Sequence, residues 1–224
     1  MRTFFCLIFT SLIYSQVVNS EIESINPEQQ LIDIKNFSTA STIFSFERLD
    51  NNKNIVLTSF FVSGNQNSSF QRAQVLVGSI KISWNLDLIG RMSSAYSDKN
   101  NALNIYGWGI SYKPGKEEKI SPWSYGINSG VSRLYNINRS SSFSLSILRI
   151  VNLDNYSVTL GFSTNNVKGV NYKAEQKLDS ENFQNNFSNV IIGTSINFMG
   201  IKVLPSYIYN SNKSTASIGL QKEF

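Results

Sequence analysis

The chain has 224 residues, with 20 Lys and Arg against 15 Asp and Glu, for a formal net charge of +5. This charge is dispersed, and no basic run with interleaved aromatic residues occurs, so nucleic-acid binding is not indicated. Because the chain has no histidine and one cysteine, it offers no imidazole ligand, no histidine-activated nucleophile and no disulfide framework, and we expect neither an enzyme nor a cofactor or metal site.

The first twenty residues have the layout of a secretory signal peptide. One positive charge, Arg2, precedes an apolar run at residues 4–14, and small or neutral residues at 18–20 supply a cleavage site. Export and removal of residues 1–20 are therefore predicted, with a buried N-terminal helix as the alternative. Cys6 lies inside the apolar run and would leave with it. No later apolar run approaches the length of a membrane-spanning helix.

Residues 21–40 are polar and irregular and form a lead-in that contains one weak candidate strand, Gln30–Asn36. From Ser41 onward, short segments with a two-residue alternation recur between turn-rich polar stretches. This rhythm is typical of antiparallel strands joined up and down. The predicted organisation is a signal peptide at 1–20, a lead-in at 21–40 and one β-barrel domain at 41–224.

Eleven alternating segments follow one another in the barrel domain. They lie at residues 42–46, 55–62, 72–84, 85–96, 102–112, 123–132, 142–147, 156–163, 190–198, 201–209 and 214–224. A closed barrel of this kind needs an even number of strands. Either Gln30–Asn36 supplies a twelfth, which we favour, or one early segment is not a strand and the count is ten. Lys113–Lys116 and Met199–Gly200 are predicted turns. Residues 165–186 interrupt the alternation and are predicted as a surface loop, with a binding loop as the alternative.

The two faces of these segments differ in chemistry. In residues 156–163, for example, Tyr, Val, Leu and Phe alternate with Ser, Thr, Gly and Ser. The polar face carries small neutral residues instead of the Lys and Glu expected on a solvated exterior, which suits a narrow, hydrated barrel interior. The apolar face would then contact lipid. A soluble β-sandwich with one wet face also alternates in this way and is the alternative.

Three charged residues, Lys81, Asp87 and Arg91, are predicted to cluster on the lumen side of two adjacent strands. One carboxylate without a second acid is a poor basis for catalysis. A charge network that braces the interior is the expected role, because buried charges are usually paired. A filter that lines a pore is the alternative.

Aromatic residues gather near the predicted strand ends, as in the two interfacial girdles of membrane barrels. One girdle would contain Trp84, Tyr112, Trp123 and Tyr156, and the other Tyr96, Tyr135 and Tyr209. Aromatic residues scattered through a soluble core are the alternative.

In the last segment, Ala216, Ile218, Leu220 and Phe224 share one face, and the intervening residues share the other. The segment resembles the closing strand of bacterial outer-membrane β-barrels, which typically ends in Phe and carries a signal read by the barrel-assembly machinery. That signal would comprise Ser217, Gly219, Lys222 and Phe224, although Lys222 occupies a position that is apolar in the pattern. The resemblance covers about eleven residues and concerns a class of proteins.

The sequence therefore predicts an all-β, antiparallel up-and-down transmembrane barrel in the outer membrane of a Gram-negative cell envelope. The partners that the resemblance implies are outer-membrane lipid and the barrel-assembly machinery, together with unidentified small solutes. A small porin-like pore or a structural membrane element is the expected function. The alternative is a soluble secreted β-sandwich or a lipocalin-like binding protein.

Overall fold

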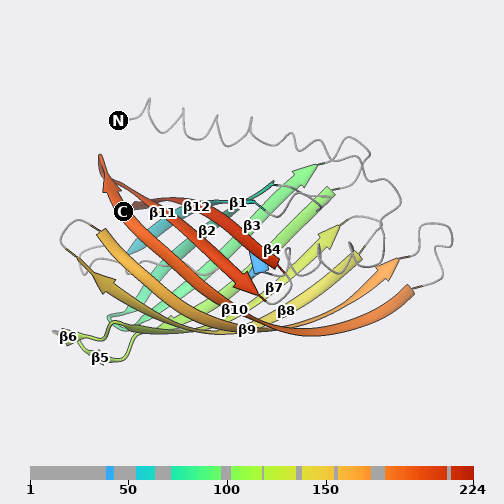
Figure 1. Ribbon diagram of the computed structural model, residues 1–224, viewed down its shortest axis with the longest axis horizontal. Helices are drawn as coiled ribbons and strands as arrows, with labels where there is room; N and C mark the ends of the chain where they lie inside the picture. Colours follow the sequence, from blue (N-terminus) through green and yellow to red (C-terminus); the bar gives the residue numbers. More distant parts are fainter. Residues whose placement is uncertain are drawn as a thin grey trace.

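The computed structural model (Figure 1) describes residues 39–42, 54–63, 72–96, 102–117, 119–134, 138–153, 156–172, 180–210 and 213–224. Four features of the sequence lie outside these ranges. They are the predicted signal peptide at 1–20, the candidate strand Gln30–Asn36, residues 43–46 of the predicted segment at 42–46, and the girdle residue Tyr135.

Within these ranges, ten antiparallel strands form one closed barrel, which confirms the predicted fold class. They are β1 (Ile55–Ser63), β2 (Arg72–Ser83), β3 (Leu86–Tyr96), β4 (Ala102–Tyr112), β7 (Trp123–Leu134), β8 (Asn138–Asn152), β9 (Tyr156–Tyr172), β10 (Ser180–Phe198), β11 (Ile201–Asn210) and β12 (Lys213–Glu223). The short strands β5 (Gly115–Lys116) and β6 (Lys119–Ile120) form a separate small hairpin between β4 and β7.

The barrel closes between its first and last strands. β1 pairs with β12 from Val56 opposite Glu223 to Ser63 opposite Ala216. The Phe224 amide extends this seam by donating to the Ile55 carbonyl at 2.9 Å. Closure leaves no open sheet edge at this seam, as a strand-built structure in lipid requires.

The ten strands of this barrel match the alternative count of the sequence analysis and not the favoured count of twelve. Of the predicted segment at 42–46, only Thr42 lies within the described ranges. Residues 39–41 form a helical turn, in which the Thr42 amide donates to the Thr39 carbonyl at 3.2 Å. Threonine and serine hydroxyls offer the backbone local hydrogen bonds that compete with a strand ladder. The first strand of the barrel begins later, at Ile55.

The predicted loop at 165–186 is wrong over most of its length, because β9 and β10 continue through it as a long hairpin. Their ladder runs without a break from Ile196 opposite Tyr156 to Ser180 opposite Tyr172. Figure 1 shows this hairpin extending well beyond β11 and β12. The alternation disappears from the sequence here because mostly polar residues, such as Thr164, Asn166 and Lys168, occupy the outer face of the hairpin, although the backbone ladder is intact.

The Met199–Gly200 turn confirms the sequence analysis. Met199 and Gly200 have φ angles of 49° and 77°, the left-handed conformation that a two-residue hairpin turn requires at both positions. The strand break at Lys113–Lys116 leads into the β5–β6 hairpin. We call the barrel end that carries Met199–Gly200 and Phe224 the short-turn end, and the opposite end, which carries the tip of the β9–β10 hairpin, the far end.

Candidate functional site in the barrel lumen

The outer face of the barrel is apolar and the inner face is largely polar. On β8 the side chains of Phe143, Leu145 and Ile147 are exposed, whereas the intervening serines are buried in the lumen. The same alternation holds on β9, where Leu160 is 51 % exposed and its neighbour Thr159 is 1 % exposed. The predicted assignment of faces is therefore correct on these strands.

The apolar outer face stops at a sharp boundary on the β9–β10 hairpin. Phe162 and Val190 lie opposite each other and are both exposed apolar residues. The next outward pair toward the far end is Thr164 opposite Ser188, and the two outward pairs after it, Asn166 opposite Asn186 and Lys168 opposite Gln184, are also polar. β9 and β10 have 17 and 19 residues, whereas about 9 to 11 suffice to cross a membrane. The hairpin is therefore long enough to carry its polar part beyond an apolar belt.

Hydroxyl pairs link neighbouring strands across the inner face. Ser132 Oγ lies 2.6 Å from Ser140 Oγ, which faces it directly in the β7–β8 ladder. Thr58 donates to the Gln221 side-chain oxygen at 3.2 Å across the closing seam. These contacts satisfy polar groups that would be costly to bury without partners.

The predicted charge cluster is only partly assembled. Asp87 is buried, and its carboxylate forms an ion pair with Lys113 at 2.5 Å. Lys81 lies opposite Asp87 in the β2–β3 ladder. Arg91 is buried further along β3, on the same face, and donates from Nη2 to the Asn128 side-chain oxygen at 2.5 Å.

Sequence reasoning missed Lys113 because it assigned this residue to a turn. The signal was the parity of β4: odd-numbered positions such as Ser111 face the lumen, and Lys113 continues that series. The lumen also holds large apolar side chains that the sequence analysis did not assign to it. Those that are fully buried are Phe60, Ile89, Ile105, Leu148 and Leu204. The interior is therefore more tightly filled than a purely serine-lined one.

The helical turn at Thr39–Thr42 lies inside the barrel, against the wall formed by β4, β7, β8 and β9 (blue in Figure 1). All four of its residues are buried. Ser41 Oγ is 2.7 Å from Ser142 Oγ on β8, and Thr42 Oγ1 donates to the Asn165 side-chain oxygen on β9 at 3.2 Å. The sequence analysis placed this segment at the junction between the lead-in and the barrel, and it did not predict that the segment lies in the lumen.

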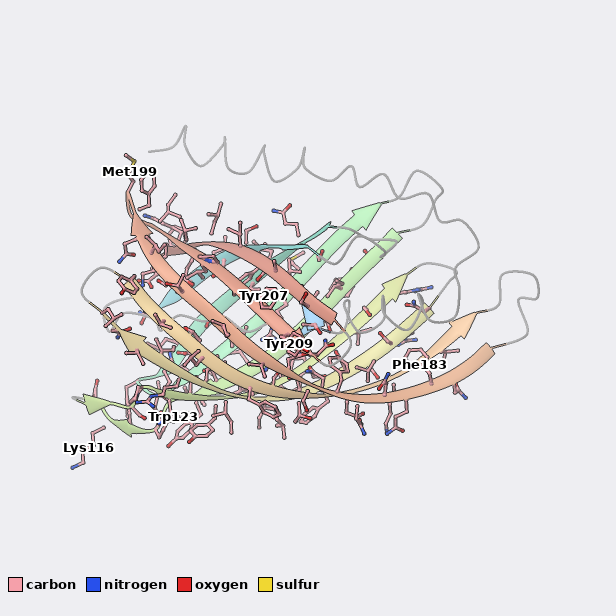
Figure 2. The ribbon with its side chains drawn as sticks, in the orientation of Figure 1. Lys116, Trp123, Phe183, Met199, Tyr207 and Tyr209 are labelled. Atoms are coloured by element: carbon pink, nitrogen blue, oxygen red, sulfur yellow. The ribbon has the colours of Figure 1, made fainter. Side chains whose placement is uncertain are left out.

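Several predicted girdle residues lie on the outer surface near a strand end. Tyr112, Trp123 and Tyr156 are exposed near the short-turn end, and Tyr209 is exposed toward the far end of β11. Figure 2 shows Trp123 at the same end of the barrel as Met199. The Arg149 guanidinium stacks over the Trp123 ring at 5.6 Å. Trp84 lies in the β2–β3 turn, and Tyr96 ends β3.

The residues of the predicted assembly signal divide between the two faces. Ser217 and Gly219 are buried on the inner face, whereas Lys222 and Phe224 are exposed on the outer face. The Lys222 ammonium donates to the Gly200 carbonyl at 3.0 Å. Lys222 thus has a hydrogen-bond partner in the neighbouring turn at the short-turn end.

Within the described ranges, no helix is long and apolar enough to cross a membrane. The same residues contain no group of three or more His, Cys, Asp or Glu that could hold a metal ion.

No protein-family model matches the chain, and no curated protein matches it significantly. Among solved structures, the N-terminal β-barrel domain of OprF from Pseudomonas aeruginosa is 10 % identical, with a TM-score of 0.41, covering 77 % of this chain and 98 % of that one. The KdgM porin in complex with oligogalacturonate is 13 % identical, with a TM-score of 0.40, covering 76 % and 99 %. Ail, the attachment invasion locus protein of Yersinia pestis, is 11 % identical, with a TM-score of 0.25, covering 76 % and 95 %. At these scores the similarity carries no inference about this chain.

Proposed function

We propose that the protein is an integral outer-membrane β-barrel with a packed lumen, acting as a structural membrane element or a narrow pore. The observation that carries this proposal is the polarity of the barrel wall. Large apolar side chains such as Trp108 and Ile192 are more than half exposed on the outside, while serine, threonine and asparagine are buried inside. Exposing so extensive an apolar surface to water is unfavourable. Soluble monomers accordingly rarely expose contiguous apolar patches beyond a few hundred Å².

The same observation argues against the soluble alternatives. A β-sandwich buries its core between two sheets, but the large sheet here is one closed barrel. A lipocalin-like barrel would place apolar side chains inside around a ligand and polar ones outside. The outer face of this barrel is apolar instead, and its inner face carries buried polar side chains alongside the apolar ones. Lipid, in which only helices and closed barrels satisfy their backbone groups, fits it, and the resemblance of the last strand makes the outer membrane the compartment that we propose.

The filled interior favours a packed lumen and argues against a wide channel. The Asp87–Lys113 ion pair, the hydroxyl pairs and Phe60 all occupy the lumen with little exposure to solvent. A pore that admits large solutes needs a continuous water-filled path through the barrel. No solute is assigned to this protein.

Fractionation tests the membrane assignment. Expressed with its predicted signal in a Gram-negative host, the protein should stay in the membrane pellet through extraction with urea or carbonate. It should also migrate faster on a detergent gel before heating than after heating, because a closed barrel resists unfolding by detergent. A soluble periplasmic protein serves as the extraction control. Recovery in the soluble fraction without a heat-dependent shift would contradict the proposal.

A further inference from the structure

We propose that the Thr39–Thr42 turn is a plug that seals the lumen. The plug is seated on one patch of the barrel wall. The proposal rests on the proposed function only in that the sealed barrel is taken to span a membrane. The plug is a segment of this same chain, and the wall residues that it contacts form what we call its seat.

The seat is a notch in the wall made by two glycines. Gly107 of β4 and Gly130 of β7 lie directly opposite each other in their ladder. A Cβ atom added at either position would come closer than 3.0 Å to atoms of Ser41. For Gly130, the three nearest atoms that such a Cβ would meet all belong to Ser41. The turn therefore occupies the volume that side chains at these positions would fill.

Polar contacts hold the turn beside this notch. The Gly130 position in β7 faces Ser142 in β8, whose hydroxyl lies 2.7 Å from that of Ser41. Thr42 reaches Asn165 on the next strand at 3.2 Å. The turn thus contacts four successive strands at one level of the barrel, and Ser41 is completely buried there.

The plug and the wall match in chemistry. The turn reads Thr-Ala-Ser-Thr, and the wall on its short-turn side continues with buried small polar residues such as Asn128 and Ser144, which face each other. If the turn left, water could replace its hydroxyl contacts with Ser142 and Asn165. We therefore expect that the turn can be displaced without unfolding the barrel.

A disulfide trap tests whether the turn occupies this seat. In a chain with Cys6→Ala, the pair Ser41→Cys and Ser142→Cys should cross-link efficiently on mild oxidation of the folded, detergent-solubilised protein. The control pair is Ser41→Cys with Ser217→Cys, whose lumen-facing serine lies on β12 and contacts Ser206. That pair should not cross-link. Equal cross-linking of both pairs, or none of the first, would overturn the plug.

A glycine substitution tests whether the turn seals the lumen. Gly130→Ala should displace the turn, whereas Gly193→Ala should not. Gly193 is also buried on the inner face, but a Cβ there would meet Ser206, with 3.3 Å as the shortest approach. The readout is labelling of Ser144→Cys, beneath the turn, by a water-soluble maleimide, with the exposed Lys116→Cys as the reference for reagent reactivity.

With Gly130→Ala, labelling at position 144 should rise at least about tenfold, because a displaced plug leaves the site open for much longer. The cross-link between positions 41 and 142 should weaken when the same glycine substitution is added to the disulfide-trap pair. Unchanged labelling and an unchanged cross-link would overturn the plug. If Gly130→Ala fails to fold, the disulfide trap alone decides. Urea extraction of the same variants reports on membrane insertion separately, so the two proposals can fail independently.

Discussion

Phe60 of β1 lies directly opposite Gly219 of β12, and its ring fills the space in which a side chain at position 219 would begin. A Cβ atom added to Gly219 would lie 2.7 Å from the ring and 3.2 Å from Leu204. These two strands form the seam that closes the barrel. Gly219, one of the residues of the predicted assembly signal, therefore also has a local packing role at the seam.

Gly219→Val should destabilise the barrel by about 1 to 3 kcal/mol, because the added methyl groups overpack a filled site. Urea unfolding in detergent micelles, followed by the heat-dependent gel shift, measures the change. The matched control is Gly78→Val on β2, where an added Cβ would meet nothing within 4 Å. Equal losses in the two variants would contradict the packing role of Gly219.

The buried ion pair gives a second prediction. Asp87→Asn should destabilise the barrel by about 3 to 5 kcal/mol, because the Lys113 ammonium stays buried without the carboxylate beside it. Lys113→Met should have a similar effect. The double variant Asp87→Leu, Lys113→Met should lose less than the sum of the single losses, since it removes both charges. Strict additivity in this cycle would show that the two side chains do not interact.

The boundary of the outer face gives a third prediction, with both test positions on the outer face of β9. Leu160→Arg should destabilise the membrane-inserted barrel by roughly 2 to 4 kcal/mol, the usual loss for a charge near the bilayer midplane. Thr164→Arg, one outward position beyond the exposed Phe162, should change stability little. Folding titrations in lipid vesicles measure both. A loss at position 164 as large as that at position 160 would contradict the boundary.

Local alternation was sufficient to predict most of the barrel. It identified the ten strands that form and the faces of residues such as Leu160 and Thr159, because side chains on successive strand residues point to opposite sides. It also located the Met199–Gly200 turn, where glycine at the second position suits the backbone. These features depend on neighbours within a few residues.

Features that depend on distant partners were not predictable in this way. The strand assignment of residues 165–172 rests on pairing with β8 and β10, which replaces a weak local pattern. The position of Ser41 rests on glycines 66 and 89 residues further along the chain, from the differences 107 − 41 and 130 − 41. Lys113, the partner of Asp87, could by contrast have been predicted, because it continues the odd-numbered, lumen-facing positions of β4. The sequence analysis missed it only because it assigned Lys113 to a turn.

The central claim is that the apolar outer face of the barrel contacts lipid up to Phe162 and water beyond it. Spin labels at Leu160→Cys and Thr164→Cys, in a Cys6→Ala chain reconstituted in vesicles, test it most directly. The account predicts that dissolved oxygen relaxes the label at position 160 more strongly than a water-soluble nickel chelate does, and that the order reverses at position 164. Strong relaxation by the nickel chelate at both positions would contradict the account.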